Sequence, residues 1–377
     1  MKYLYIASLA DNSSSVREKV FLQLKHLTLS GLDVKLLPFT NTSILTEEEL
    51  RYCDLPLISQ LTEIQDGIEN NDILSLYRFY KLIKQCHYDT ILLRYHRTSV
   101  ALILSLAKGK KWVPIFESII EKEQFDKEGV FSKLLLFIVA RIRNKFILSK
   151  SLAVVGVTDE IARYYADASG QKTTHILPNS IEKIHKYPAE RNINKVVAIG
   201  NISKAQGFDR IIPMFNDHRM KHVHLYFIGD GPALARLKEM AKSVLCSENI
   251  HFSGVLDRQA IENELHTAAI GISPLAAHKK GLKRACALKT REYLSFGLPV
   301  ILGYDDVDLM PGLQFVLQVP PDDTPISADD FLSFHAYIQQ HSFLREDIYA
   351  YVNKYMLYEN RMKLFAEFLK SQEVGTV

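Results

Sequence analysis

Short apolar runs alternate with stretches of helical period along most of the chain, which is the pattern of parallel sheets covered by helices on both faces. In the first half, strands are predicted at residues 2–9, 33–39, 90–95, 111–117, 152–158 and 173–178. Helices are predicted between them at residues 16–30, 70–87, 99–107, 131–148 and 159–168. Residues 40–68 form a long polar connection that fits neither period.

The second half repeats this architecture without a clear sequence repeat. Strands are predicted at residues 196–200, 223–229, 250–254, 269–274, 298–303 and 315–320, with helical stretches between them. Residues 181–194 read as a linker, and residues 349–369 read as one long closing helix. We therefore predict an α/β protein with one Rossmann-like domain at residues 1–183, a second at 184–350 and a C-terminal helix at 351–377.

Residues 288–301 predict a short helix, a glycine stop and a buried strand. Gly297 suits the left-handed position after a helix end, and Pro299 falls where a helix cannot continue. The preceding Ala-Cys-Ala offers no capping side chain, so the first helical amides are free to hold an anion. Glu292 lies one turn further in, where a carboxylate can accept hydrogen bonds from two ribose hydroxyls. A buried surface helix with a solvated Glu292 is the alternative.

Turns and charges gather near this helix at the predicted ligand edge. Residues 196–210 predict strand, loop and helix, in which Gly200 lets backbone approach a phosphate. Gly229 follows another strand, with Pro232 at a predicted first helical position. Five cations, which suit a diphosphate but equally a solvated loop, fall within eleven residues: Lys279, Lys280, Lys283, Arg284 and Lys289.

The first half has its own polar residues where strands end. Asn12, Ser13 and Ser14 follow the first predicted strand and either contact a ligand or cap the next helix. Arg94 and Glu117 end two further strands, and Arg94 either holds an acceptor group or pairs with a carboxylate.

Composition excludes several other classes. The net charge of +3 is too small to argue for nucleic acid, and four widely spaced cysteines indicate neither zinc nor disulfides. The apolar run at residues 134–140 is too short for a bilayer, which needs about 20 residues. Residues 131–150 mix apolar and basic positions and predict a core-facing helix with a basic outer face, or a face resting on an anionic membrane. No Gly-x-Gly-x-x-Gly follows the first strand, which argues against a nicotinamide enzyme.

The motifs resemble those of family 4 glycosyltransferases. The segment from Glu292 to Ile301 is similar to that family's Glu-Tyr-x-x-x-Gly-x-Pro-Val-Ile, and residues 157–161 and 177–181 resemble its Thr-Glu-x-Ile and Pro-Asn-Gly-Ile elements. The resemblance implies the GT-B fold, two Rossmann-like domains facing each other across a cleft, with the terminal helix crossing back to the first domain. It also implies Glu292 on the ribose, and further donor contacts at Gly200, Asn201, Ser203, Gln206, Gly229, Leu288, Lys289 and Thr290.

The chain departs from the family in two places. Arg284 stands where the family's first glutamate would be, eight residues before Glu292, so the resemblance leaves His278 and Lys279 to face the donor sugar as the catalytic candidates. Asn201 and Gln206 are uncharged where family members often carry Arg and Lys. A His-x-Lys-Gly loop followed by Leu-Lys-Thr-x-Glu-Tyr, found in some relatives, is the nearest match.

The resemblance therefore predicts a retaining, metal-independent glycosyltransferase that needs no cofactor besides its nucleotide-sugar donor, which we expect to be UDP-linked. The expected acceptor is a hydroxyl of a cell-surface glycan, glycolipid or glycoprotein, approached by Asn12, Ser13, Ser14, Arg94 and Glu117. We expect a cytoplasmic bacterial protein; contact with the inner face of the membrane, and a homo-oligomer or a partner glycosyltransferase, remain open. The alternatives are a non-catalytic glycosyltransferase-like subunit and a nucleotide-sugar epimerase of GT-B architecture.

Overall fold

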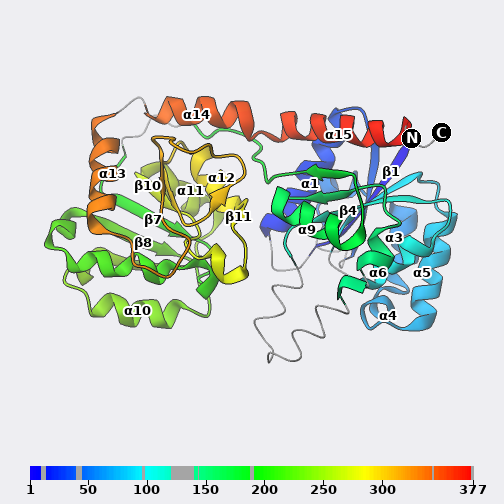
Figure 1. The fold of residues 1–377 in the computed structure, drawn as a ribbon, viewed down its shortest axis with the longest axis horizontal. Coiled ribbons are helices and arrows are strands. Elements are labelled where there is room, and N and C mark those ends of the chain that lie inside the picture. The colour runs from blue at the N-terminus through cyan, green and yellow to red at the C-terminus, as the bar shows by residue number, and fades with distance from the viewer. Residues whose placement is uncertain are drawn as a thin grey trace. The chain divides into compact units, whose positions relative to one another are not determined.

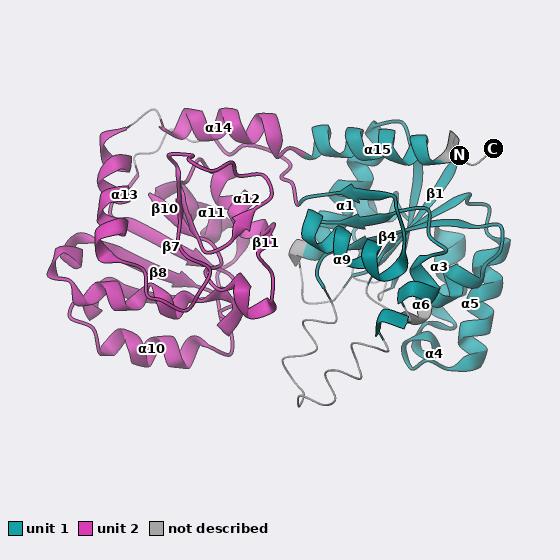
Figure 2. Cartoon of the chain, viewed as in Figure 1, with its two compact units in different colours: residues 1–178, 358–377 teal, residues 179–357 magenta. Residues whose placement is uncertain are grey.

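The computed structural model divides the chain into two compact units (Figure 2). Unit 1 comprises Met1–Pro178 and Tyr358–Val377, and unit 2 comprises Asn179–Leu357. The structure describes residues 1–9, 14–39, 45–95, 98–119, 140–142, 144–186, 191–341 and 344–374. None of the helices in these ranges is both long enough and apolar enough to cross a membrane.

Unit 1 is built on a six-stranded parallel sheet in the order β2-β1-β3-β4-β5-β6 (Figure 1). Its strands are β1 (Lys2–Ser8), β2 (Asp33–Phe39), β3 (Thr90–Arg94), β4 (Lys111–Phe116), β5 (Val154–Gly156) and β6 (Thr174–Ile176). Apart from the partly exposed edge strand β6, they are mostly apolar and buried, as expected of a sheet covered on both faces. Its helices are α1 (Ser14–Leu29), α2 (Glu47–Leu50), α3 (Leu55–Thr62), α4 (Gln65–Glu69), α5 (Ile73–Gln85), α6 (Thr98–Leu106), α9 (Asp159–Ser169) and α15 (Tyr358–Val374). The predicted strands are confirmed.

The polar connection at residues 40–68 contains the short helices α2, α3 and α4, which its sequence pattern did not predict. Side-chain caps start two of them, since Thr46 accepts a hydrogen bond from the amide of Glu49 and Asp54 from the amide of Leu57. These helices are too short for a 3.6-residue period to emerge. The helix predicted at residues 131–148 lies mostly outside the described residues, although residues 140–142 and 144–148 are helical.

Unit 2 has a second six-stranded parallel sheet, in the order β14-β12-β10-β7-β8-β9. Its strands are β7 (Lys195–Ile199), β8 (His224–Ile228), β9 (Ile250–Gly254), β10 (Ile270–Ile272), β12 (Val300–Leu302) and β14 (Val316–Gln318), and a separate pair is formed by β11 (Arg284–Ala285) and β13 (Asp305–Asp306). Its α-helices are α10 (Leu234–Lys242), α11 (Arg258–Thr267), α12 (Leu288–Ser295), α13 (Ala328–Gln340) and α14 (Leu344–Tyr355). All six predicted strands of this half are present.

The segment after β7 differs from the prediction. Instead of one helix it forms four 3-10 turns, η2 (Lys204–Gln206), η3 (Phe208–Arg210), η4 (Ile212–Asn216) and η5 (His218–His222). Gly207 interrupts them with a φ of +66°, and Pro213 lacks the amide that an α-helix needs. Pro232 was also misplaced, because α10 begins two residues later, at Leu234.

The closing helix and the domain boundaries also differ from the prediction. The expected single helix is two helices, because α14 ends at Tyr355 and α15 begins at Tyr358. At the break, the carbonyl of Met356 accepts a hydrogen bond from the amide of Ile181, 3.0 Å away. This carbonyl therefore pairs with Ile181 and is not available for a helical hydrogen bond across the break. Unit 2 accordingly extends to Leu357 rather than 350, and the first segment of unit 1 ends at Pro178 rather than 183, while Tyr358–Val377 forms its second segment.

A buried ion cluster holds α12 in unit 2. The guanidinium of Arg291, whose side chain is fully buried, donates to both oxygens of Asp306 and, at 2.6 Å, to Asp308. Asp306 belongs to β13, so the cluster fixes the middle of α12 against the small β11–β13 pair. An arginine suits this position because its planar fork can bind two carboxylates at once.

Replacing Arg291 by Met should lower the free energy of unfolding by about 3–5 kcal/mol, because the two carboxylates would remain buried after losing their cation. Arg236→Met is the matched control, since Arg236 pairs with Asp209 at an exposed site and such pairs contribute about 0–1 kcal/mol. Urea titration measures both. Equal losses in the two variants would contradict the role of the cluster.

Candidate functional site

The strand order of unit 2 marks one position at the carboxyl edge of its sheet. The chain proceeds outward from β7 through β8 to β9 on one side, and from β10 through β12 to β14 on the other. The two central strands, β7 and β10, are therefore the switch point, where open α/β sheets bind their ligands. The loop after β7 carries Gly200 to Gln206, and the loop after β10 carries His278 and Lys279. Both groups of residues therefore follow the two central strands, as the sequence analysis predicted.

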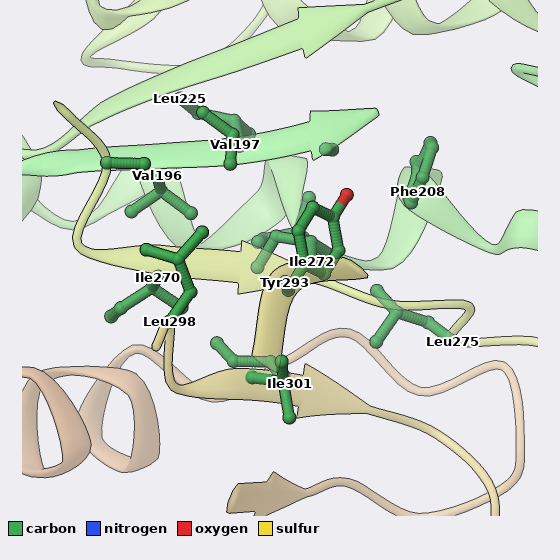
Figure 3. Close-up of a cluster of buried hydrophobic side chains, with 14 of the residues drawn as sticks. Val196, Val197, Phe208, Leu225, Ile270, Ile272, Leu275, Tyr293, Leu298 and Ile301 are labelled. Carbon is green, nitrogen blue, oxygen red and sulfur yellow. The ribbon is translucent and has the colours of Figure 1, made fainter. Parts of the chain in front are cut away.

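Helix α12 is fixed behind the switch point by its buried polar side chains. The hydroxyl of Tyr293 accepts a hydrogen bond of 2.8 Å from the amide of Ile199, the last residue of β7. The ring lies against Gly271, where an added Cβ would be 2.4 Å from it. Figure 3 shows Tyr293 among the apolar side chains of β7 and β10. The sequence analysis did not single out Tyr293, because no motif marks this bond.

Thr290 is turned into the same core rather than toward a ligand. Its hydroxyl is 2.8 Å from that of Ser273 and 2.6 Å from that of Tyr304, and the residue is fully buried. The Thr290 hydroxyl is therefore engaged inside the core. Of the groups of Thr290 that could contact a donor, only the backbone amide lies at the start of the helix. The helix begins at Leu288 after Ala287, and no side chain caps it, as the sequence predicted.

Gly200 and Gly229 bring two loops together and leave room for a lysine. They have φ values of +116° and +133°, and a Cβ on Gly229 would lie 2.1 Å from the carbonyl oxygen of Gly200. A Cβ on Gly200 would in turn lie 3.2 Å from the Nζ of Lys289. A side chain at Gly229 would therefore collide with the neighbouring loop, and a side chain at Gly200 would crowd Lys289.

Lys289 is the cation that the structure brings to this point. Its Nζ donates a 2.8 Å hydrogen bond to Oε1 of Gln206 and lies 5.1 Å from the ring centroid of Phe208. Burial lowers the pKa of its amine from 10.5 to about 8, and the carboxylate of Glu292 opposes part of this shift. Lys289 and Gln206, from distant parts of the sequence, thus meet in one partly buried contact. Gln206 is one of the positions where the family motif often has a cation.

Glu292 is held by an arginine that the sequence analysis did not single out. Oε1 of Glu292 accepts a hydrogen bond of 2.5 Å from Arg258, the first residue of α11, and Arg258 also donates to Glu262 at 2.8 Å. The Glu292 side chain remains 28% exposed, so the pairing with Arg258 does not bury it. No motif marks Arg258; only the fold brings the start of α11 beside α12.

His278 and Lys279 lie on η7 (Ala277–Lys280) and share a carboxylate. Oδ1 of Asp323 is 3.2 Å from Nε2 of His278 and 2.8 Å from Nζ of Lys279. The bond from Lys279, and then that from His278, holds the pKa of Asp323 below its usual value. Nδ1 of His278 is buried without a hydrogen-bond partner. The η7 loop adjoins the first loop, since the amide of Leu275 donates to the carbonyl of Gln206 at 2.7 Å.

Asn201 and Ser203 complete the loop after β7. The amide of Ser203 donates to the carbonyl of Asn201 at 3.1 Å, and the side chain of Ser203 makes no capping bond to η2. Asn201 is exposed, and its Oδ1 lies 2.5 Å from where a Cβ of Gly231 would be. Both residues belong to the loop that follows β7, at the edge of the sheet where Lys289 meets Gln206.

The predicted acceptor residues belong to unit 1. Glu117 accepts a hydrogen bond of 2.5 Å from Lys19 of α1 and lies 3.6 Å from Nε of Arg94. Burial alone would raise the pKa of Glu117, but the charges of Lys19 and Arg94 outweigh it and hold that pKa below its usual value. Arg94 therefore pairs with a carboxylate, one of its two predicted possibilities. Asn12 and Ser13 lie outside the described residues; Ser14 is the first residue of α1.

Two Rossmann-like units, with an uncapped helix and a partly buried lysine at one switch point, define an α/β protein of the GT-B class. Within the described ranges, no group of three or more His, Cys, Asp or Glu is placed to hold a metal ion. Residues 193–322, all within unit 2, match the family model described as glycosyl transferases group 1. No curated protein sequence matches the chain.

Solved structures show the same fold at low identity. HepE of Anabaena in complex with UDP is 12% identical with a TM-score of 0.68, and covers 98% of this chain and 100% of its own. HepE in complex with UDP-glucose gives 13%, 0.66 and the same coverage. WaaG, a glycosyltransferase involved in lipopolysaccharide biosynthesis, is 14% identical with a TM-score of 0.62, covering 97% of this chain and 99% of its own. The predicted GT-B fold is confirmed.

Lys289 should titrate near pH 8 in the folded protein, because burial disfavours its charged form. NMR of isotope-labelled lysine, assigned with Lys289→Met, measures this directly. Because the unfolded chain binds the proton more tightly, stability relative to the Lys289→Met variant should also rise between about pH 8 and pH 10.5. A titration midpoint at the ordinary value, or a flat stability difference across that range, would show that the amine is solvated.

Proposed function

We propose that the chain is a retaining glycosyltransferase that moves a sugar from a UDP-sugar to a hydroxyl of a cell-surface glycan, glycolipid or glycoprotein. The observation that carries this proposal is the uncapped start of α12, with Lys289 beside it and Glu292 one turn further in. The group 1 domain and the UDP complexes of HepE support a UDP-linked donor.

The diphosphate would lie at the start of α12. The amides of Leu288, Lys289 and Thr290 have no capping side chain, and the helix dipole favours an anion there. Lys289 would exchange its bond to Gln206 for a phosphate oxygen, and the anion would raise the lowered pKa of its amine. One cation and a set of amides then replace the two cations that family members often carry after the first strand of this domain.

Glu292 would bind the ribose. Arg258 holds one carboxylate oxygen in place and leaves the other for the ribose hydroxyls. This arrangement orients the carboxylate oxygens of Glu292 before the nucleotide sugar binds, which lowers the entropy lost on binding. Arg258 is thus a positioning residue in this proposal.

Bond cleavage builds negative charge on the leaving diphosphate. Amides and Lys289, aimed at that group, would stabilise this charge without a bound metal. His278 and Lys279 would face the donor sugar, either while they still share Asp323 or after they release it. Retention by attack on the same face, assisted by the leaving phosphate, rests on the family resemblance alone.

A non-catalytic partner subunit is the second candidate. It is favoured by Arg284 in place of the family's first glutamate, and by the engagement of His278 and Lys279 with Asp323. Such a subunit would bind a nucleotide but release no sugar.

The substitution Glu292→Gln should weaken UDP binding about ten- to hundredfold, because hydrogen bonds to a charged group contribute about 1.5–3 kcal/mol each. Glu262→Gln is the matched control, since Glu262 also binds Arg258 but is not one of the proposed donor contacts. Calorimetry with UDP, after a thermal-shift screen of UDP-, GDP- and ADP-sugars, measures the affinities.

Turnover separates the candidate functions. Incubation with the preferred nucleotide sugar alone should release free sugar and UDP slowly, and Glu292→Gln should reduce that rate. Binding without release would favour the partner subunit, and a new sugar epimer would favour an epimerase. Unchanged UDP affinity in Glu292→Gln would refute the assigned site.

A further inference from the structure

The start of α12 is secured from outside the helix. No side chain among the described residues caps it, and a connector of only two residues, Cys286 and Ala287, separates Leu288 from the end of β11. The carbonyl of Ala287 accepts a helical hydrogen bond of 3.5 Å from the amide of Arg291. The orientation of the first helical amides therefore depends on how this connector is held.

Asn179 holds the connector through two hydrogen bonds to Cys286. Its backbone amide donates to the Sγ atom of Cys286 at 3.0 Å, and its side-chain Nδ2 donates to the Cys286 carbonyl oxygen. Both residues are buried, where the loss of a hydrogen bond leaves a polar group unpaired. Burial raises the pKa of the Cys286 thiol to about 12, so the sulfur that accepts the amide hydrogen is neutral near pH 7.

The segment that begins at Asn179 also reaches the other end of α12. The amide of His185 donates to the carbonyl of Ser295, the last residue of the helix, at 2.8 Å. The His185 ring stacks on that of Phe296, with 4.1 Å between the ring centroids. Residues 179–185 therefore hold α12 at both ends. The bond at the far end occupies a carbonyl of the helix, whereas the two bonds from Asn179 end on Cys286, which precedes the helix.

This difference matters for the binding of an anion. A capping Ser, Thr, Asp or Asn would accept hydrogen bonds from the same amides that an anion needs. The contact between Asn179 and Cys286 stabilises the approach to the helix and leaves the amides of residues 288–290 to a ligand. Support of the helix start and binding of an anion therefore do not compete.

We propose that Asn179 is a positioning residue for the diphosphate of the donor, which it orients without touching it by fixing the connector ahead of α12. This role rests on the proposed function, because it takes the start of α12 as the diphosphate site. Loss of the contact should weaken binding of phosphate groups and leave binding of the base and ribose unchanged.

A comparison of UDP with uridine tests this role. Asn179→Ala should weaken UDP binding about three- to tenfold, the factor that one hydrogen bond contributes. Uridine has the base and the ribose but no phosphate, so it should bind the variant as it binds the parent chain. Calorimetry with UDP and ligand-observed NMR with uridine measure the two affinities on the full chain. A residue that only supports the fold would not separate the two ligands in this way.

Asn249→Ala is the matched control. Asn249 is also buried in unit 2, and its Nδ2 donates to the carbonyl of Met220 at 3.2 Å. Neither of these residues belongs to α12 or its connector. The control variant should lose a similar amount of thermal stability and keep the UDP affinity of the parent chain.

The sulfur offers a second pair of variants. Cys286→Ala removes the acceptor of the Asn179 amide hydrogen, whereas Cys286→Ser supplies a hydroxyl oxygen that can still accept it. UDP affinity should therefore fall further in Cys286→Ala than in Cys286→Ser, and uridine affinity should change in neither.

The possible failures are distinguishable. If Asn179→Ala binds UDP as tightly as the parent chain, the positioning role is overturned. Parallel losses of UDP and uridine affinity, or an equal loss of UDP affinity in Asn249→Ala, would also overturn it. A parent chain that binds no UDP would refute the proposed function itself, and this role with it.

Discussion

The hydrogen bond between the amide of Ile199 and the hydroxyl of Tyr293 is the constraint on which the site in unit 2 depends. It ties α12 to the last residue of β7 inside an apolar core, where an unpaired donor is costly. Gly271 admits the tyrosine ring because it has no side chain. Thr290 and Arg291 anchor the same helix through further buried bonds. The start of α12 is thereby held at the switch point with its amides facing outward.

The position of α12 explains how a chain with few cations after β7 can still offer positive charge there. Asn201 and Gln206 are neutral, but Lys289 reaches Gln206 from the helix and lies in the space left by Gly200. Burial keeps the pKa of Lys289 low in the free protein, which is a cost to stability that an anion would offset on binding. The free protein is therefore less stable, but its lysine is already in position to bind an anion.

Much of the architecture could be predicted because it depends on local patterns. Apolar runs gave both sheets, and the glycine and proline after α12 marked its end, with Gly297 at a φ of +66°. Burial of Arg291 could not be predicted, because a charged residue in a helical pattern reads as exposed until Asp306 and Asp308 are seen beside it. Arg258 was missed for the same reason: its contact with Glu292 joins residues that are far apart in the sequence. The 3-10 turns after β7 were not predicted, because the side chains around Gly207 support a helical period that this glycine interrupts.

A crystal structure of the chain with UDP tests the central claim most directly. The account predicts diphosphate oxygens within hydrogen-bond distance of the amides of residues 288–290, with Lys289 Nζ moved from Gln206 to a phosphate oxygen and the ribose on Glu292. A diphosphate bound elsewhere, with Lys289 still on Gln206 and α12 still held by Tyr293, would contradict it.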